Sequence, residues 1–294
     1  MRSLKEIRIR LSSITSTRKI TSAMKMVSSV KLRKAQDAVL RFVPYQEKLK
    51  TILGNLLSAE LEMEIPLATK RTAQNVSIVV FSSNTGLCGA FNANVYKKFL
   101  SVLENYKHLP AENIRIYTVG KRVSDLLRRQ KMTFTNLREL SENPTFANTG
   151  ALANQLMDDF LTGKTDEVVL IYNFFKNAAV QKPQSEVLLP ITIETGEGEG
   201  KGGGGGTNRD YILEPTREEL ISDFLPRAVR LHLYNVMLNT LAAEQGARTT
   251  AMQTATDNAD NLLQELNIEY NKARQEAITK QILDIVGGAE ALKG

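Results

Sequence analysis

Residues 243–259 read AEQGARTTAMQTATDNA, with an alanine at every fourth position from Ala243 to Ala259. Side chains four residues apart lie on one face of a helix, so these alanines form a narrow stripe. Small side chains on such a stripe allow a second helix to approach closely. The stripe is continued, at steps of three and four residues, by Leu262, Leu266, Tyr270, Ala273 and Ala277. The stretch therefore predicts a long helix that packs against another helix.

The signals for the ends of this helix lie far apart. Pro215 and Thr216, followed by two glutamates, are typical of a helix start, because carboxylates are stabilised at the positive end of the helix dipole. Gly287 and Gly288 are typical of a helix stop. At about 1.5 Å per residue such a helix would be on the order of 100 Å long, which is far more than a compact domain requires.

Residues 1–58 predict a second long helix with an apolar stripe at heptad spacing. The stripe consists of two blocks, Leu4, Ile7, Leu11 and Ile14, and then Ala35, Ala38, Phe42, Tyr45, Leu49, Ile52 and Leu56. Between the blocks Ile20, Met24 and Val27 lie one residue out of phase, so the stripe is expected to swerve there. Pro44 predicts a kink or a break.

The two long helices are expected to pair as an antiparallel coiled coil, because each can cover the apolar stripe of the other. Aligning the start of one helix with the end of the other places Met24 near Arg248. Residues after about 272 would then extend alone. They carry Ile278, Ile282 and Ile285 with nothing in this chain to cover them, which indicates a partner protein.

The middle of the chain alternates between strand and helix patterns. Strands are expected at 76–81, 114–119 and 168–174, helices at 92–106, 121–130 and 147–162, and a further strand at 185–193. This order predicts a largely parallel sheet covered by helices, and Pro190 places the last strand at an edge because proline cannot donate to a ladder. The glycine-rich segment 196–206 predicts a flexible loop.

The predicted fold class is therefore α/β: a long antiparallel coiled coil of the N-terminal and C-terminal helices, plus a Rossmann-like domain with a mostly parallel sheet. The expected parts are an N-terminal shaft helix at 1–58, an α/β domain at 70–195, a flexible loop at 196–210 and a C-terminal shaft helix at 211–294.

Composition excludes several classes of protein. The chain has 294 residues, of which 42% are hydrophobic and 24% charged, which is ordinary for a globular protein. The longest apolar runs are far shorter than the roughly twenty residues of a membrane span, so neither an export signal nor a membrane span is expected. Cys88 is the only cysteine, which rules out an internal disulfide and a cysteine zinc cluster. The two histidines, His108 and His232, are interpreted as surface or packing residues.

Charge is uneven along the chain. The first 41 residues contain eleven lysines and arginines and two acidic residues, so this segment is expected to meet an acidic partner. One alternative function is therefore a basic coiled coil that binds nucleic acid. The segment lacks the interleaved aromatic residues that would support that alternative.

No catalytic or cofactor motif is present. Gly200-Lys201 lacks the first glycine and the final hydroxyl residue of a phosphate-binding loop. The stretch from Gly86 to Phe91 lacks the glycine spacing of a dinucleotide site, so a structural turn is expected and an NAD-dependent enzyme is not. Cys88 is interpreted as a buried, inert thiol. The chain is predicted to be no enzyme and to bind no cofactor.

Five ordered motifs, the first of which runs from residues 5–8 through 17–27, resemble one family, the gamma subunit of the F-type ATP synthase. The resemblance covers nearly the whole chain, and it is carried by residues 5–8, 17–27, 85–92, 210–215, 251–258 and 270–279. The sequence departs from the family at Gln281, where an acid is usual, and at Asn84-Thr85, where a charged pair is usual. The lone Cys88 implies that there is no regulatory dithiol. The absence of a long presequence resembles bacterial members.

The resemblance implies a non-catalytic rotor that couples proton-driven rotation of a membrane ring to conformational changes of catalytic beta subunits. The implied partners are an alpha3beta3 hexamer, the epsilon subunit and the c-ring of Fo, with no nucleic acid and no direct membrane span. The implied location is peripheral, at the cytoplasmic face of the bacterial inner membrane. The implied beta-subunit contacts are Met24, Lys25, Arg248, Arg274, Gln275 and Thr279, and the implied contacts of the foot with epsilon and the c-ring are Tyr211 and Glu214.

Overall fold

A computed structural model of the chain describes residues 3–57, 65–191 and 216–291. The chain forms two compact units, a helical unit of Met1–Ser29 with Arg248–Gly294 and a sheet unit of Val30–Ala247. Each of the two long helices, α1 (Leu4–Leu57) and α6 (Arg217–Ala291), has one segment in the helical unit and another in the sheet unit. The predicted boundaries of the four parts stay a prediction, and the glycine-rich loop lies outside the described residues.

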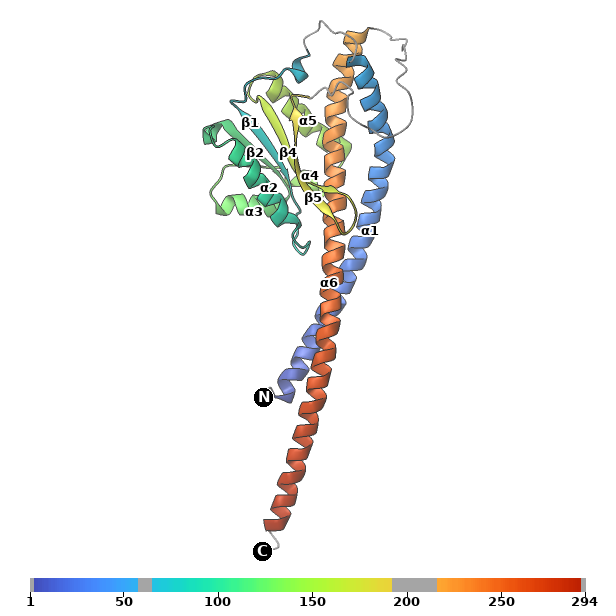
Figure 1. The fold of residues 1–294 in the computed structure, drawn as a ribbon, viewed down its shortest axis with the longest axis vertical. Coiled ribbons are helices and arrows are strands. Elements are labelled where there is room, and N and C mark those ends of the chain that lie inside the picture. Colours follow the sequence, from blue (N-terminus) through green and yellow to red (C-terminus); the bar gives the residue numbers. More distant parts are fainter. Residues whose placement is uncertain (1–2, 58–64, 192–215, 292–294) are drawn as a thin grey trace. The chain divides into compact units, whose positions relative to one another are not determined.

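The sheet unit is built on five strands (Figure 1). They are β1 (Val76–Phe81), β2 (Ile114–Val119), β3 (Thr135–Asn136), β4 (Glu167–Phe175) and β5 (Gln181–Leu189), in the order β3-β2-β1-β4-β5. Neighbouring strands are parallel except β4 and β5, which are antiparallel. Strand β5 lies at the edge of the sheet. The predicted mostly parallel sheet is confirmed. The edge strand ends at Leu189, immediately before Pro190, because proline has no N–H for the ladder.

Helices connect the strands at the expected places. They are α2 (Phe91–Asn105), α3 (Lys121–Arg129), α4 (Arg138–Glu142) and α5 (Phe146–Leu161), with short 3-10 turns at Pro66–Ala68 and Ala111–Asn113. The three predicted helices are found within one or two residues. Strand β3 and helix α4 were not predicted, because segments of two and five residues are too short to show a hydrophobic period.

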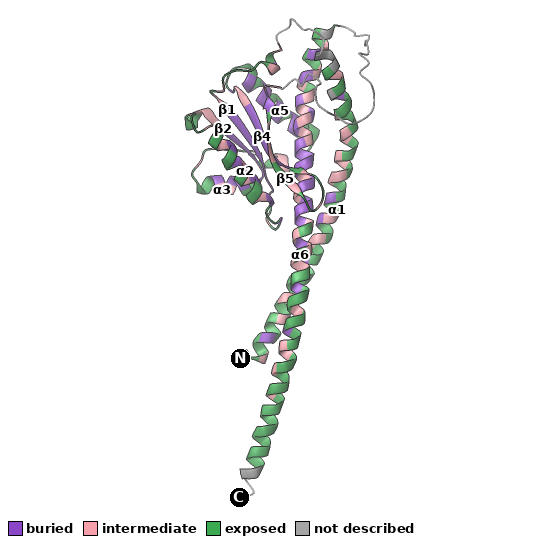
Figure 2. Cartoon of the chain, in the orientation of Figure 1, coloured by how far each residue is buried: buried purple, intermediate pink, exposed green. Residues whose placement is uncertain are grey.

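The two faces of the sheet are covered by different helices. On one face Val80 of β1 packs with Phe99 of α2 and Leu127 of α3. The other face is covered by α5 and by the part of α6 up to Met237, where Leu233 belongs to the same buried cluster as Leu156. This part of α6, where buried residues alternate with half-buried and exposed ones in Figure 2, is thus a covering helix of the α/β domain.

The start of α6 is as predicted and its end is not. The hydroxyl of Thr216 accepts a hydrogen bond from the Glu219 N–H (3.3 Å), which caps the first turn. The helix continues through Gly287 and Gly288 to Ala291, so the predicted glycine stop is wrong. A glycine stop requires a left-handed backbone, and neither glycine is among those with positive φ. Of the predicted kink or break at Pro44, the break is wrong, since α1 runs through Pro44 without interruption, and the kink stays a prediction.

The buried face of α1 in the helical unit differs from the prediction. Ile7, Thr21 and Ser28 are buried at 2%, 9% and 3% exposure, whereas Ile20 and Val27 are exposed. The spacing from Ile7 through Thr21 to Ser28 is a multiple of seven, so the stripe keeps its phase and the predicted swerve is wrong. Small hydroxyl residues occupy the buried positions where apolar residues were sought.

The small-residue face of α6 is largely confirmed. Ala259 and Leu266 are buried in the helical unit, while Leu262 is exposed and Leu263 takes its place as a half-buried residue. In the sheet unit, Ala243 and Ala247 are buried against Cys88 and Phe91, beside Phe175. The alanine stripe therefore serves two different neighbours along its length.

Candidate functional site

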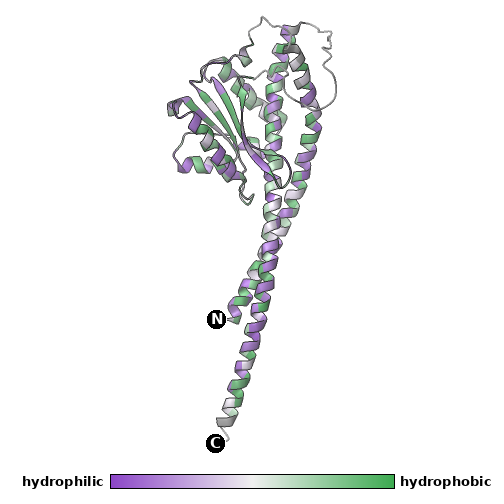
Figure 3. Ribbon diagram, viewed as in Figure 1, coloured by the Kyte–Doolittle hydropathy of each residue, from purple (hydrophilic) through white to green (hydrophobic). Residues whose placement is uncertain are grey.

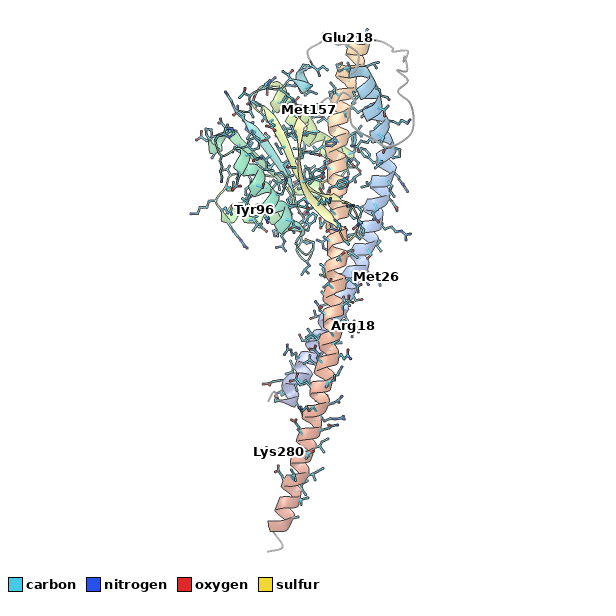
Figure 4. The ribbon with its side chains drawn as sticks, viewed as in Figure 1. Arg18, Met26, Tyr96, Met157, Glu218 and Lys280 are labelled. Carbon is cyan, nitrogen blue, oxygen red and sulfur yellow. The ribbon has the colours of Figure 1, made fainter. Side chains whose placement is uncertain are left out.

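Polar contacts between described side chains join α1 to α6 within the helical unit. Arg8 donates through Nη2 to the Tyr270 hydroxyl (3.0 Å), and its guanidinium lies 5.9 Å from the centre of the tyrosine ring. Arg18 Nε lies 2.5 Å from Asp260 Oδ1, and the Thr256 hydroxyl donates to the Thr21 hydroxyl (2.8 Å). Figure 4 labels Arg18 on this helix pair. As α1 advances, the contacts retreat along α6, so the two helices are antiparallel, as predicted.

These contacts correct the predicted alignment of the two helices. The predicted alignment would place Thr21 opposite residue 251, but Thr21 pairs with Thr256, about five residues further along α6. Met24 therefore does not lie opposite Arg248. The prediction assumed that the start of the C-terminal helix lies level with the end of the N-terminal helix. In the structure the alignment follows from the side-chain pairs between the two helices.

The last part of α6 in the helical unit forms an exposed tip, which we define as residues 274–289. Figure 2 shows this segment as exposed and Figure 3 shows apolar residues scattered among polar ones. Ile278, Ile282 and Ile285 are 49%, 54% and 71% exposed, and their spacing of four and three places them on one helix face. An exposed apolar stripe of this kind is typical of a surface that a partner covers, as the sequence predicted.

The tip carries three of the predicted beta-subunit contacts. Arg274, Gln275 and Thr279 are all exposed. The pKa of the Tyr270 hydroxyl is lowered from its usual value, first by the hydrogen bond from Arg8, then by the charge of Arg8, and to a smaller extent by that of Arg274. Arg8 of α1 and Arg274 of α6 thus both act on the Tyr270 hydroxyl at the base of the tip.

The other predicted contacts differ in accessibility. Met24 and Lys25 are half-buried on α1, and Arg248 is only 7% exposed, so its side chain is covered by the chain itself. Tyr211 and Glu214 lie outside the described residues. The roles of all these residues remain predictions.

The sequence analysis missed an exposed apolar line on α1. Ile9, Ile20 and Val27 are 60%, 59% and 56% exposed. Their spacings of eleven and seven residues place them on one face, which is rotated by roughly 100° around the helix from the buried residues Thr21 and Ser28. The sequence does contain a signal for this line, because Ile20 and Val27 lie out of phase with the heptad stripe. A helix with apolar residues in two such phases has two apolar faces that need to be covered.

Several basic side chains of α1 are exposed. Lys19 belongs to the helical unit, Arg33 and Lys34 belong to the sheet unit, and all three side chains are exposed. Arg8 and Arg18, by contrast, are engaged with α6. Part of the basic charge in the first 41 residues therefore serves pairing of the helices, and the rest faces outward.

The turn before α2 is a closed structural turn. Asn92 Nδ2 donates to the Ser83 hydroxyl (2.8 Å) and to Cys88 Sγ (3.1 Å), and Cys88 is 1% exposed. The Arg122 guanidinium lies so close to Gly86 that an added Cβ would be 2.7 Å from it. The predicted structural turn and buried thiol are confirmed.

Ionisable groups elsewhere in the sheet unit are engaged in packing. His232 Nε2 of α6 lies 2.7 Å from Glu186 Oε1 of β5, and burial, assisted by the charge of Glu186, raises the pKa of Tyr172 far above its usual value. No cluster of three or more potential metal ligands occurs within residues 3–57, 65–191 and 216–291. Along the same three segments, no helix has the length and apolarity to cross a membrane.

The sequence matches a family model described as "ATP synthase" over residues 3–292. The "ATP synthase gamma chain" of Bacteroides fragilis strain ATCC 25285 is 47% identical over 294 residues, covering 99% of this chain and 100% of the relative. That of Christiangramia forsetii is 46% identical over 297 residues, with both chains fully covered.

Solved structures share the fold. A chain from the Euglena gracilis mitochondrial ATP synthase (OSCP/F1/c-ring) aligns with a TM-score of 0.66 at 22% identity, covering 98% of this chain and 94% of that chain. A chain from the Tetrahymena thermophila mitochondrial ATP synthase (central stalk/c-ring) aligns with a TM-score of 0.56 at 23% identity, covering 80% of this chain and 99% of that chain.

Proposed function

The chain belongs to the family of ATP synthase gamma chains, and from this premise we propose how its surfaces work as the central rotor shaft of the enzyme. The observation that carries the proposal is the tip of α6, a helical segment that is exposed except at the half-buried Ala277 and presents different side chains in different directions. The shaft itself is non-catalytic. The alternative of a nucleic-acid-binding coiled coil is not favoured, because two arginines of its basic segment are engaged with α6.

The tip can bias its neighbours by rotation alone. Ile278, Ile282 and Ile285 form an apolar face, whereas Glu276 and Lys280 point elsewhere around the helix. A ring of three identical beta subunits around this helix would meet three different contact surfaces at any one angle. Each subunit would then experience a different free-energy difference between its open and closed states, and turning the shaft would pass these biases around the ring.

The partners follow from this role. The similar Euglena and Tetrahymena chains come from assemblies of F1 with a c-ring and of a central stalk with a c-ring, and by analogy we assign this chain to an alpha3beta3 hexamer and a c-ring. The epsilon subunit is the further expected partner, reached through the foot residues Tyr211 and Glu214. The complex is peripheral to the membrane, and we place it at the cytoplasmic face of a bacterial inner membrane.

Copurification tests the assignment of partners. A tagged full-length chain should recover alpha, beta and epsilon subunits from its own cells in the presence of nuclease. A nuclease-sensitive set of partners, with binding that falls steeply as salt is raised, would instead support the nucleic-acid alternative.

The double substitution Arg274→Ala with Gln275→Ala tests the contacts at the base of the tip. Both residues are exposed, so the melting temperature of the chain should stay unchanged. A charge-assisted contact made only at certain shaft angles is worth about 1.5–3 kcal/mol, so ATP hydrolysis by the assembled complex should slow about tenfold or more.

The matched control is Asn271→Ala with Lys272→Ala, an exposed pair one turn earlier. Unimpaired turnover in a fully assembled Arg274/Gln275 variant would remove these two residues from the beta contact. Thr279, which is also exposed, can be tested in the same format.

A further inference from the structure

Two arginines, one from each long helix, lie at the hydroxyl of Tyr270 near the start of α1. Arg8 donates through Nη2 to the Tyr270 oxygen (3.0 Å). Arg274 lies one turn after Tyr270 on the same side of α6, and helix side chains lean towards the N-terminus, so Arg274 extends back towards this hydroxyl. The pKa of the hydroxyl is lowered first by the hydrogen bond from Arg8, then by the charge of Arg8, and to a smaller extent by that of Arg274. Both helices therefore contribute a cation to one location.

Hydrogen-bond donors at this location remain unused. The Tyr270 oxygen accepts from Arg8, so its own O–H is left to donate, and a guanidinium carries several further N–H donors beyond the one that Arg8 uses here. In the part of the chain that the structure describes, neither Arg8 nor Arg274 is paired with a carboxylate. The three groups together can thus hold an acceptor from outside the chain.

The acidic residues nearby lie on other sides of the two helices. At 3.6 residues per turn, three glutamates lie roughly 140–180° around α6 from Arg274. They are Glu265, Glu269 and Glu276. On α1, Glu6 lies about 160° around the helix from Arg8. Its carboxylate accepts from the Ser3 N–H (3.1 Å) and so caps the first turn. These carboxylates are directed away from the Tyr270 hydroxyl.

The two arginines adjoin the apolar face of the tip. Tyr270, Arg274, Ile278 and Ile282 follow one another at steps of four residues along one side of α6. A partner that covers the isoleucines also removes water from the arginines beside them, and a desolvated cation without a counter-ion is strongly disfavoured. The partner must therefore supply an anion beside an apolar surface. A protein carboxylate meets both requirements, whereas a nucleic-acid backbone offers charge without the apolar surface.

We propose that Arg8, Tyr270 and Arg274 form one anion-binding site, built from both helices, for the carboxylate of an aspartate or glutamate of the subunit that covers the tip. Arginine is well suited to this role, because its planar guanidinium donates two parallel hydrogen bonds to a carboxylate. Arg8 and Tyr270 thereby join the contact surface, and the partner holds α1 and α6 at once. The identity of the occupant rests on the proposed rotor function, whereas the three donors are a property of the chain.

A double-mutant cycle tests whether the two arginines hold the same carboxylate. The affinity of the full-length chain for the isolated alpha and beta subunits is measured for the wild type, Arg8→Gln, Arg274→Gln and the double variant. Each single change should weaken binding about tenfold or more, because a charge-assisted hydrogen bond is lost. The double change should weaken binding by less than the product of the two single effects, because both remove contacts to one group. A double effect equal to that product would indicate separate sites and overturn the proposal.

Arg10→Gln is the matched control on α1. Arg10 is also exposed, but it lies about 160° around the helix from Arg8, so this variant should bind like the wild type. Equal losses for Arg8→Gln and Arg10→Gln would indicate a general attraction between charges and would overturn the site.

The amine introduced by Arg8→Lys allows the carboxylate to be identified. In the assembled complex a carbodiimide should join this amine to an aspartate or glutamate of a surrounding subunit through an amide bond, and mass spectrometry of the peptides locates the bond. Arg10→Lys is the control and should give no such product. An Arg8→Lys chain that assembles without this crosslink would contradict the proposal.

The circular dichroism and melting temperature of each variant should match those of the wild type, because exposed pairs contribute little to stability. Loss of affinity only in variants that have also lost helical circular dichroism would assign Arg8 to helix pairing and overturn the site. If the wild-type chain binds the subunits and the arginine variants bind equally well, the site fails while the rotor assignment stands. If the wild-type chain does not bind them, both fail.

Discussion

Ala259 marks a position where one methyl group decides how closely two helices approach. It is 5% exposed in the helical unit, on the same face as the Thr256 and Leu266 side chains. Ala259→Leu should lower the melting temperature, because the added isobutyl group overpacks the contact at a cost of about 1–3 kcal/mol. Ala289→Leu, at an exposed position of the tip, is the control and should leave the melting temperature unchanged. Equal melting temperatures for both variants would show that the space around Ala259 can accommodate a leucine side chain.

Tyr270 gives the helix pair a measurable dependence on pH. Arg8 lowers the pKa of this hydroxyl from its usual 10.0, so the folded chain releases the proton at a lower pH than the unfolded chain does. Between the two pKa values the unfolded chain binds more protons, so the stability from this contact rises as pH increases towards 10 and is lost as pH falls through the folded pKa.

An ultraviolet difference titration against Tyr270→Phe isolates this tyrosine from the other seven. Replacing Arg8 by glutamine should raise its pKa towards the usual value. An identical titration curve with and without Arg8 would mean that the contact does not persist in solution.

Helices and strands were predictable where they are long enough for their hydrophobic periodicity to repeat in the sequence. The ranges of β1, β2, α2, α3 and α5 agree with the sequence patterns within one or two residues. The buried face of α1 was misjudged, because Thr21 and Ser28 carry hydroxyl groups and only the three-dimensional pairing shows that they replace Ile20 and Val27 in the contact. Helix alignment had no signal in either helix alone, since it depends on pairs such as Arg18 with Asp260.

The apolar face of the tip can be tested as one element. Ile278→Ser, Ile282→Ser and Ile285→Ser together should leave the melting temperature of the chain unchanged, because all three side chains are already exposed. Burial of an isoleucine contributes about 1.5–3 kcal/mol, so binding of the chain to the isolated alpha and beta subunits should weaken at least tenfold. Leu283→Ser, on another face of the same helix, is the control. Equal affinities for the triple variant and the wild type would remove this face from the interface.

At the scale of the whole molecule, the α/β domain resembles a nucleotide-binding fold without its binding site. The turn that follows β1 is filled by its own side chains, with Ser83, Cys88 and Asn92 bonded to one another. The sequence predicted this from missing glycines, and the candidate site on α6 was predicted from uncovered isoleucines. The accessibility of Arg248 could not be predicted, because burial depends on how the helices are aligned.

The isolated chain should therefore show no saturable binding of ATP in calorimetric titration and no ATP hydrolysis. The same titration on the assembled complex is the positive control, since the catalytic beta subunits should bind there. One site per isolated chain would contradict the assignment of a non-catalytic shaft.

Gly287 and Gly288 lie inside α6, and an added Cβ at either position would meet no neighbouring atom within 4 Å. Each glycine costs about 1 kcal/mol of helix propensity relative to alanine, so the backbone resists bending least at this pair. Under a force perpendicular to its axis the helix would bend at these glycines first, while the preceding segment that carries the three isoleucines stays straight. The end of the shaft is therefore its most compliant part, which can adapt to small misalignments between the helix and the surface around it.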